Sequence, residues 1–227
     1  MDKKSEIPAA AVARLPRYYR MLAALLGEGV YRISSRDLAS RMGVTASQIR
    51  QDLHMFGEFG QQGYGYNVKY LSGKIGEILG VDEAYSAVII GTGALGRAVA
   101  ESSMLVGCGI FTKAIFDTDI DALCGEGETI GGCPICKISE LESFFAENRI
   151  DLAVITDNSP CAERLCRLGV KGIWNLGSSD IPKYEGVSIR NSCPGDVLMM
   201  LCCDVKMAMD KKTKDAEGGE EDEETGF

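Results

Sequence analysis

The first 80 residues carry apolar side chains at intervals of three and four, a pattern that predicts short amphipathic helices. One helix is expected over 15–27, where Pro16 suits the first turn and a glycine ends the segment. A second should follow the N-cap signal at Ser34 and end at Gly43. A third should begin at Thr45, because Thr with Gln three residues later forms a capping-box pattern. Two short helices joined by three residues predict a helix-turn-helix.

A glycine-rich segment over 57–66 comes next and holds four glycines in ten residues. Aromatic side chains alternate with glycine there, which predicts a β-hairpin, the wing of a winged helix. One more amphipathic helix is expected over 71–79.

From residue 87 the pattern changes to short, wholly apolar, β-branched runs separated by helix-like stretches, as in parallel strands buried on both faces. We expect strands over 87–90, 112–116, 152–156 and 172–176, and helices over 97–106, 141–148 and 161–168. Alternation of strand and helix indicates a Rossmann-type doubly wound parallel sheet. The segment 197–209 is again apolar, and a small Rossmann domain has no spare face to bury it, so we expect a dimerisation helix there.

Composition narrows the class of protein. The 227 residues are 45% apolar and 25% charged, which is ordinary for a soluble globular chain and excludes collagen, coiled coil and disorder throughout. The longest apolar run, 197–203, is far short of the ~20 residues that span a bilayer. The N-terminus lacks the apolar core of a signal peptide, so we expect a cytoplasmic protein with no membrane partner. With nine cysteines but one histidine, we expect reduced, packed thiols and no metal site.

Charge is distributed unevenly around a net value of −9. Residues 1–80 hold 11 Lys and Arg against 7 Asp and Glu, a charge balance of +4. Residues 81–203 hold 9 basic against 17 acidic side chains, and residues 204–227 hold 4 basic against 9 acidic side chains. A basic head on an acidic body favours a module that binds a polyanion, here double-stranded DNA. On the third helix, the face opposite Ile49 and Leu53 carries four predicted DNA-binding residues, Ser47, Arg50, Gln51 and His54. The alternative is a small helical packing module with a solvated polar face.

The segment Gly91-Thr-Gly-Ala-Leu-Gly96 has the context that a dinucleotide site needs. It directly follows a predicted strand and precedes a helix, and Asp117 ends the next strand 21 residues after Gly96, at the offset of a carboxylate that binds ribose hydroxyls. The glycines would permit a tight turn, close approach of a pyrophosphate and close helix packing, and the helix N-terminus offers free N–H donors. The predicted cofactor-binding residues are Gly91, Thr92, Gly93, Ala94, Leu95, Gly96, Asp117 and Thr156.

The carboxylate of Asp117 should favour NAD(H), because it would repel the 2′-phosphate of NADP(H). A dehydrogenase also needs a proton donor, yet the body has no histidine and no Tyr-x-x-x-Lys pair. We therefore predict no catalytic residue and favour a nucleotide sensor. Three alternatives stay open: a small NAD-dependent oxidoreductase with an accessory N-terminal domain, a constitutive DNA binder with NAD as a structural ligand, and a glycine-rich turn that binds nothing.

Taken together, these segments resemble the Rex family of redox-sensing transcriptional repressors, in the same order and over nearly the whole chain up to about Asn191. The matching motifs are Ile7-Pro8, Arg14-Leu-Pro-Arg-Tyr-Tyr-Arg20, Ile33-Ser-Ser35, Gln48-Ile-Arg50, Phe56-Gly-Glu-Phe-Gly60, Gly63-Tyr-Gly-Tyr-Asn-Val68, Gly91-Thr-Gly-Ala-Leu-Gly96 and Gly172-Ile-Trp-Asn175. The resemblance implies a homodimer with exchanged C-terminal helices and repression that NADH relieves. The resemblance also adds Arg14, Gln48, Gln62 and Tyr64 to the predicted DNA-binding residues. A two-fold symmetric dimer would read an inverted-repeat operator.

The chain departs from the family pattern at several positions. Gln51 and Gln62 stand where the family usually has basic residues, which implies an altered affinity or target sequence. Ser102 stands where many members have a tyrosine that helps an arginine of the head and an aspartate of the C-terminal helix to exchange partners. The resemblance gives these two roles to Arg14 and Asp196.

Two further segments bear on ligand and redox chemistry. Asp157-Asn-Ser-Pro160 leads into a shorter helix than the family usually has, which implies an altered nicotinamide end of the pocket. Cys133-Pro-Ile-Cys136 has the spacing of a redox motif, but the resemblance puts it on a strand, where the two thiols point to opposite faces and serve packing.

We therefore divide the chain into a winged-helix DNA-binding domain over 1–80, a Rossmann NAD(H)-binding domain over 81–195, a dimerisation helix over 196–210 and a disordered acidic tail over 211–227. The expected fold class is α/β.

Overall fold

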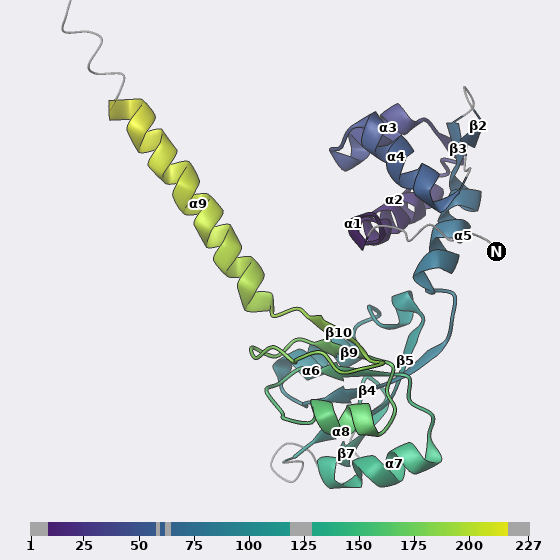
Figure 1. The fold of residues 1–227 in the computed structure, drawn as a ribbon, viewed down its shortest axis with the longest axis vertical. Coiled ribbons are helices and arrows are strands. Elements are labelled where there is room, and N and C mark those ends of the chain that lie inside the picture. The colour runs from purple at the N-terminus through teal and green to yellow at the C-terminus, as the bar shows by residue number, and fades with distance from the viewer. Residues whose placement is uncertain (1–8, 58–59, 62–64, 119–128, 218–227) are drawn as a thin grey trace, which may run out of the picture. The chain divides into compact units, whose positions relative to one another are not determined.

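The computed structural model describes residues 9–57, 60–61, 65–118 and 129–217. The chain forms two compact units, Met1–Glu83 and Ala84–Phe227 (Figure 1). Among the described residues, the first unit contains five helices and three strands: α1 (Ala9–Val12), α2 (Leu15–Gly27), β1 (Arg32–Ile33), α3 (Ser35–Met42), α4 (Ala46–Phe56), β2 (Gly60–Gln61), β3 (Gly65–Asn67) and α5 (Val68–Leu79).

Side-chain caps start α3 and α4, as predicted. The Ser34 hydroxyl accepts the Asp37 N–H at 3.0 Å to start α3, and Gly43 ends α3 at a φ of +65°. The Thr45 hydroxyl accepts the Gln48 N–H at 3.1 Å to start α4. One shared core holds the helices together, with side chains from α2, α3, α4 and α5 fully buried.

The predicted wing is confirmed as an antiparallel hairpin. Strands β2 and β3 pair with each other, and β1, which the sequence pattern did not reveal, pairs with the other edge of β3. Gly65 is required there, because its φ is +69° and a Cβ would lie 2.6 Å from the backbone oxygen of Ile33.

The second unit is built on a seven-stranded sheet. Its elements are β4 (Tyr85–Ile90), α6 (Ala94–Glu101), a 3₁₀ turn (Val106–Cys108), β5 (Ile110–Asp117), β6 (Thr129–Ile130), β7 (Cys133–Lys137), a second 3₁₀ turn (Ile138–Glu140), α7 (Leu141–Glu147), β8 (Leu152–Ile155), α8 (Ala162–Arg167), β9 (Gly172–Asn175), β10 (Ser188–Asn191) and α9 (Pro194–Glu217). The strand order is β10-β9-β8-β4-β5-β7-β6, and every neighbouring pair is parallel except β7 and β6.

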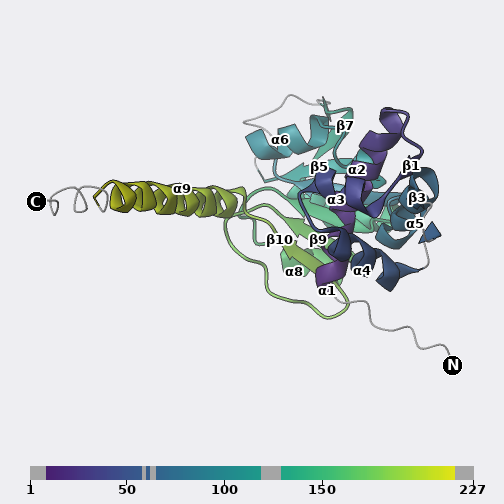
Figure 2. The same ribbon diagram turned by 90° about the horizontal axis from the view of Figure 1, so that it is seen from above.

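The sheet is covered on both faces, which explains the continuous apolar runs of its central strands (Figure 2). Val88 and Ile90 of β4 pack with α7 and α8, whereas Ile89 packs with Val99 of α6 on the other face. The expected α/β class with a doubly wound parallel sheet is confirmed.

The expected bounds of three helical segments are wrong, one of them being α5, which begins at Val68 and not at residue 71. The helix expected over 97–106 is α6, which begins at Ala94 and ends at Glu101, because the Ser102 hydroxyl donates to the Val99 carbonyl at 2.9 Å and the backbone turns extended. The tail was expected from residue 211, whereas α9 continues to Glu217, since the Lys, Ala and Glu in this stretch favour helix. The rest of the expected tail, 218–227, lies outside the described residues.

The pair Cys133 and Cys136 lies on β7, as expected. Cys133 packs with the cluster around α6 and Cys136 with the cluster around α7 and α8, so the two thiols face opposite sides of the sheet. Burial raises the pKa of both thiols, and the charge of Glu140 adds to the effect at Cys136. A raised pKa is the opposite of the activated thiolate that a redox motif needs.

Candidate functional site

The predicted dinucleotide residues come together where the strand order reverses. Strand β4 lies between β5 and β8. Strand β4 leads into the glycine loop 91–96, β5 ends at Asp117, and β8 ends just before Thr156. Parallel strands present their carboxyl ends at one edge, and a reversal of strand order leaves a crevice there.

The three glycines of the loop have three different surroundings. Gly91 has a φ of +104°, and a Cβ on it would lie 2.6 Å from the Thr156 hydroxyl. A Cβ on Gly96 would lie 1.9 Å from the carbonyl oxygen of Gly91, so only glycine lets α6 pack this closely on the strand end. A Cβ on Gly93 would meet nothing within 4 Å. The loop is therefore closed at its base and open at Gly93, which fits the approach of a pyrophosphate.

The start of α6 offers uncapped N–H groups beside that open position. Gly93 is the N-cap, and no side chain caps the helix, which continues through Ala94 and Leu95. The Arg97 Nε donates to the carbonyl of Thr92 at 3.1 Å and so lies against the loop. Free N–H donors and the positive end of a helix dipole are suited to a phosphate.

The Asp117 carboxylate lies against the same loop. Its Oδ2 accepts the Thr92 N–H at 2.7 Å and the Thr92 hydroxyl at 2.6 Å, and its Oδ1 accepts the Thr118 N–H at 2.6 Å. Thr92 is buried, so its polar groups orient Asp117. The Thr118 hydroxyl also lies 3.3 Å from Oδ1, so both oxygens of the carboxylate accept hydrogen bonds at the edge of the loop, where a ribose hydroxyl would approach.

Thr156 also supports the loop. Its hydroxyl donates to the Ile90 carbonyl at 2.9 Å and lies 3.3 Å from the Gly91 carbonyl. The bond ties the end of β8 to the end of β4 and fixes the base of the crevice. Together, the open Gly93, the uncapped helix and the oriented carboxylate fit the phosphates and one ribose of NAD(H).

In the first unit, α4 separates a buried face from an exposed polar face, as predicted. Ile49 and Leu53 are buried, whereas the exposed residues are Ser47, Arg50, Gln51 and His54. The Arg50 Nη1 donates to the Ser35 hydroxyl at 3.1 Å, which links α4 to α3. Gln62 and Tyr64, predicted to contact DNA from the wing, lie outside the described residues.

Arg14 and Gln48, both predicted to contact DNA, converge on a buried carboxylate. Asp52 is fully buried on α4 and accepts hydrogen bonds from Arg14 Nε at 2.7 Å, Arg14 Nη2 at 2.6 Å, Gln48 Nε2 at 2.7 Å and the Tyr18 hydroxyl at 2.7 Å. Burial alone would raise the Asp52 pKa, but these bonds outweigh burial and hold the pKa below its usual value. The cluster anchors α4 to α2.

Sequence reasoning did not identify Asp52. The signal was an acidic residue between Ile49 and Leu53 on the apolar face of the helix. A charge at such a position requires a partner. The Gln48 side chain, which a full capping box would turn back to the N-cap backbone, donates to Asp52 four residues on.

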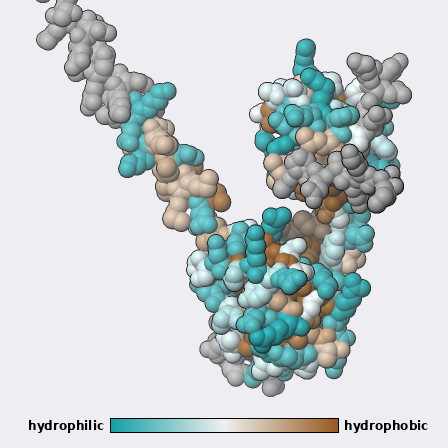
Figure 3. Space-filling view, viewed as in Figure 1, coloured by the Kyte–Doolittle hydropathy of each residue, from teal (hydrophilic) through white to brown (hydrophobic). Residues whose placement is uncertain are grey.

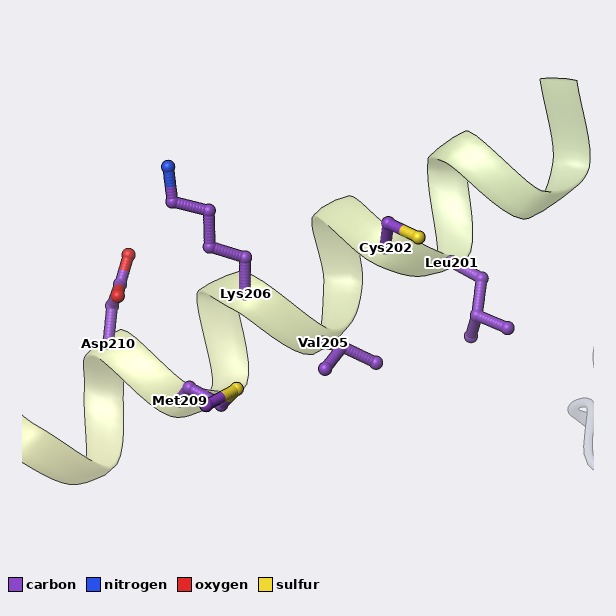
Figure 4. A pocket seen from close by; sticks show the side chains of 6 residues that line it. All are labelled: Leu201, Cys202, Val205, Lys206, Met209 and Asp210. Atoms are coloured by element: carbon purple, nitrogen blue, oxygen red, sulfur yellow. The ribbon is translucent and has the colours of Figure 1, made fainter.

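Helix α9 exposes a long apolar surface within the single chain. The exposed large apolar side chains are Val197, Leu198, Met199, Met200, Leu201, Val205, Met207 and Met209. Leu201, Val205 and Met209 project on one side, with Lys206 and Asp210 on the other (Figure 4). In the space-filling view, apolar side chains gather along α9 (Figure 3).

Two features are absent from the part of the chain that the structure describes. No group of three or more His, Cys, Asp or Glu side chains there is placed to hold a metal ion. No helix in the same residues has the length and apolar character needed to cross a membrane.

Two family models match the chain. One, described as "Putative DNA-binding protein N-terminus", matches residues 6–54, and the other, described as "CoA binding domain", matches residues 82–178.

Similar proteins include the redox-sensing transcriptional repressor Rex of Clostridium novyi, 44% identical over 205 residues that cover 88% of this chain and 96% of the relative. Rex of Thermoanaerobacter pseudethanolicus is 44% identical over 195 residues, covering 84% and 86%. Rex of Clostridium acetobutylicum is 41% identical over 207 residues, covering 89% and 95%.

Solved structures of a Rex-family repressor are also similar to this chain. The protein RSP in complex with β-NAD⁺ and operator DNA matches with a TM-score of 0.82 and 38% identity, covering 98% of this chain and all of that one. RSP in complex with β-NADH matches with a TM-score of 0.80 and 36% identity, covering 92% and 99%. A third similar structure is a crystal structure of RSP, which is named there as a Rex-family repressor.

Proposed function

Because the chain belongs to the Rex family of redox-sensing transcriptional repressors, we propose that it is a homodimeric DNA-binding repressor that NADH releases from its operator. The observation that carries the proposal is the presence in one chain of a winged helix with an exposed polar face on α4 and a glycine cradle open at Gly93. The similar protein RSP has been crystallised with NAD⁺ and operator DNA and with NADH, which supports the same two ligands here.

In this proposal each segment has its own role. The winged helix, 1–80, binds DNA, with Ser47, Arg50, Gln51 and His54 facing the major groove and Gln62 and Tyr64 on the wing. Arg14 and Gln48 act through Asp52, which holds α4 in place. The body, 81–195, binds NAD(H) through 91–96, Asp117 and Thr156, and the two copies of α9 hold the dimer together.

NADH can release DNA only if it binds the released arrangement of the dimer more tightly than the DNA-bound one. When bound, the dinucleotide supplies no reaction in this scheme; it acts by occupancy. The protein is then a cytoplasmic regulator without catalytic activity.

A DNA mobility shift with NAD⁺ and NADH titrated separately tests the proposal. The probe is an inverted-repeat duplex selected by the protein from a random pool. We expect NADH to release the duplex at concentrations where NAD⁺ leaves it bound. Steady-state hydride transfer would instead support the oxidoreductase, and retention of DNA that neither nucleotide changes would support a constitutive DNA binder.

The choice of nucleotide should depend on Asp117. We expect NADH to bind at least about tenfold more tightly than NADPH, since a charge repulsion of about 1.4 kcal/mol gives that ratio. In Asp117→Ser the ratio should fall toward one. Calorimetry of the wild type and of Asp117→Ser, each with NADH and with NADPH, measures the two ratios. Equal affinities of the wild type for NADH and NADPH would rule out this role for Asp117.

The cysteines on β7 should play no part in the response. Because their thiols face opposite sides of the sheet, we expect the double variant Cys133→Ser, Cys136→Ser to keep operator binding and its release by NADH. The same mobility shift, with and without reductant, makes the measurement. A folded variant that no longer responds to NADH would reveal a thiol switch.

A further inference from the structure

Two asparagines join the last two strands of the body at the residues where these strands end. Asn175 ends β9 and Asn191 ends β10, and the parallel register places the two residues side by side. The Asn175 Nδ2 donates to the Asn191 Oδ1 at 2.8 Å, and the Asn175 carbonyl accepts the Ser192 N–H at 2.8 Å. Side chains therefore fix the end of β10, a four-residue strand at the edge of the sheet.

The same asparagine pair, Asn175 and Asn191, holds the loop that follows β9. The Asn175 Oδ1 accepts the Gly177 N–H at 3.0 Å, and its Nδ2 also donates to the Ser179 carbonyl at 2.9 Å. The Asn191 Oδ1 accepts the Ile181 N–H and its Nδ2 donates to the Ile181 carbonyl, both at 3.0 Å. Asn175 is 2% exposed, so its part of this network is shielded from water.

The loop after β9 also contacts a wall of the dinucleotide crevice. The Asn158 Oδ1 accepts the Ser178 N–H at 2.9 Å and the Ser178 hydroxyl at 3.0 Å. A Cβ on Gly177 would lie 2.3 Å from the Asp157 carbonyl oxygen, so the segments after β8 and β9 are in close contact. Asp157 itself lies at the base of the glycine loop, because its Oδ2 is 3.1 Å from the position of a Cβ on Gly91.

On its other side, the asparagine pair leads into α9. The helix begins at Pro194, three residues after Asn191, and the Asp196 N–H donates to the Cys193 carbonyl at 3.1 Å in its first turn. Residues 196–211 of α9 are all exposed in the single chain. The helix is therefore fixed to its own body mainly at its base, next to the asparagine pair.

We propose that Asn175 and Asn191 are positioning residues for the response to NADH. The inference rests on the proposed function, in which a dinucleotide in the crevice changes the arrangement of a dimer that α9 holds together. NADH shifts that arrangement only if its binding energy differs between the two states of the dimer. A hydrogen-bonded network from the crevice wall to the base of α9 makes the crevice and the dimer helix move together, and so supplies that difference.

The test is the variant Asn191→Ala in the full chain. Asn191 is exposed, so its truncation leaves no cavity and removes only its bonds to Asn175 and Ile181. The measured quantity is the ratio of the operator dissociation constant at saturating NADH to that without NADH, by fluorescence anisotropy. We expect this ratio to fall at least about fivefold, or about 1 kcal/mol. The NADH affinity of the free protein, the operator affinity without NADH and the dimer should stay as in the wild type.

Reciprocity gives a second measurement, which a merely structural role would not change. Operator-bound wild type should bind NADH more weakly than the free protein by the same ratio, because coupling between two ligands is mutual. Asn191→Ala should reduce that difference by the same factor. Asn191→Asp keeps the acceptor oxygen and loses only the donor to the Ile181 carbonyl, so its ratio should lie between those of Asn191→Ala and the wild type. It carries the test if Asn191→Ala does not fold.

The matched control is Asn148→Ala. The Asn148 Nδ2 donates to the Phe144 carbonyl at 3.0 Å at the end of α7, which precedes β8 and so lies at the amino ends of the strands. We expect its ratio to equal that of the wild type. An unchanged ratio in Asn191→Ala, an equal fall in the control, or loss of NADH affinity or of the dimer in Asn191→Ala would overturn the inference. If NADH does not release operator from the wild type, the proposed function fails as well; if it does, only this inference is at risk.

Discussion

NADH binding is expected to fall by at least about 100-fold, or about 2.7 kcal/mol, in the variant Gly93→Arg. Gly93 has nothing within 4 Å of its Cβ position, and its φ of −61° suits any residue, so the fold should tolerate a side chain there. That side chain would occupy the space where a pyrophosphate meets the start of α6. Calorimetry with NADH measures the loss.

The matched control is Gly107→Arg. Gly107 also has open space around its Cβ position, but it lies in the 3₁₀ turn before β5, at the opposite end of the strands from the loop. We expect this variant to bind NADH as the wild type does. Tight binding by Gly93→Arg, or equal loss in both variants, would contradict the assignment of the loop.

Removal of α9 is the second change with a large expected effect. A chain ending at Asp196 loses all eight exposed large apolar side chains of α9, which are 50–69% exposed in the single chain. We expect it to be a monomer and to bind operator at least about 100-fold more weakly, because two linked heads gain affinity that one head lacks. Sedimentation gives the assembly state and fluorescence anisotropy gives the affinity.

Arg50→Ala separates assembly from DNA recognition. Arg50 is exposed on α4, far in sequence from α9, so the dimer should persist while the preference for the selected operator over random duplex is lost. A full-length chain that sediments as a monomer at working concentration, or a truncated chain that binds operator as well as the full chain, would refute the proposed architecture.

The predictions that held depended on local chemistry. Ser34, Thr45 and Gly43 define their helices through contacts within a few residues, so sequence alone locates α3 and α4. The crevice was also predictable, since a parallel sheet places the ends of successive strands at one edge.

The features that the sequence did not reveal depend on distant contacts. Arg14 and Asp52 are 38 residues apart, and no spacing rule connects them. Strands β6 and β10 are short edge strands with exposed positions, so they lack the apolar run that marks β4 and β8. The place of Asp157 beside Gly91 follows from strand order, which only the folded sheet fixes.

One titration tests the central claim, that a dinucleotide in the body controls DNA binding by the head. The fluorescence anisotropy of labelled operator DNA is recorded with the full chain and with Gly93→Arg, while NADH is added at a fixed NAD⁺ concentration. The account predicts that NADH releases DNA from the wild type and leaves the variant bound. Release of DNA from both proteins at the same NADH concentration, or from neither, would contradict it.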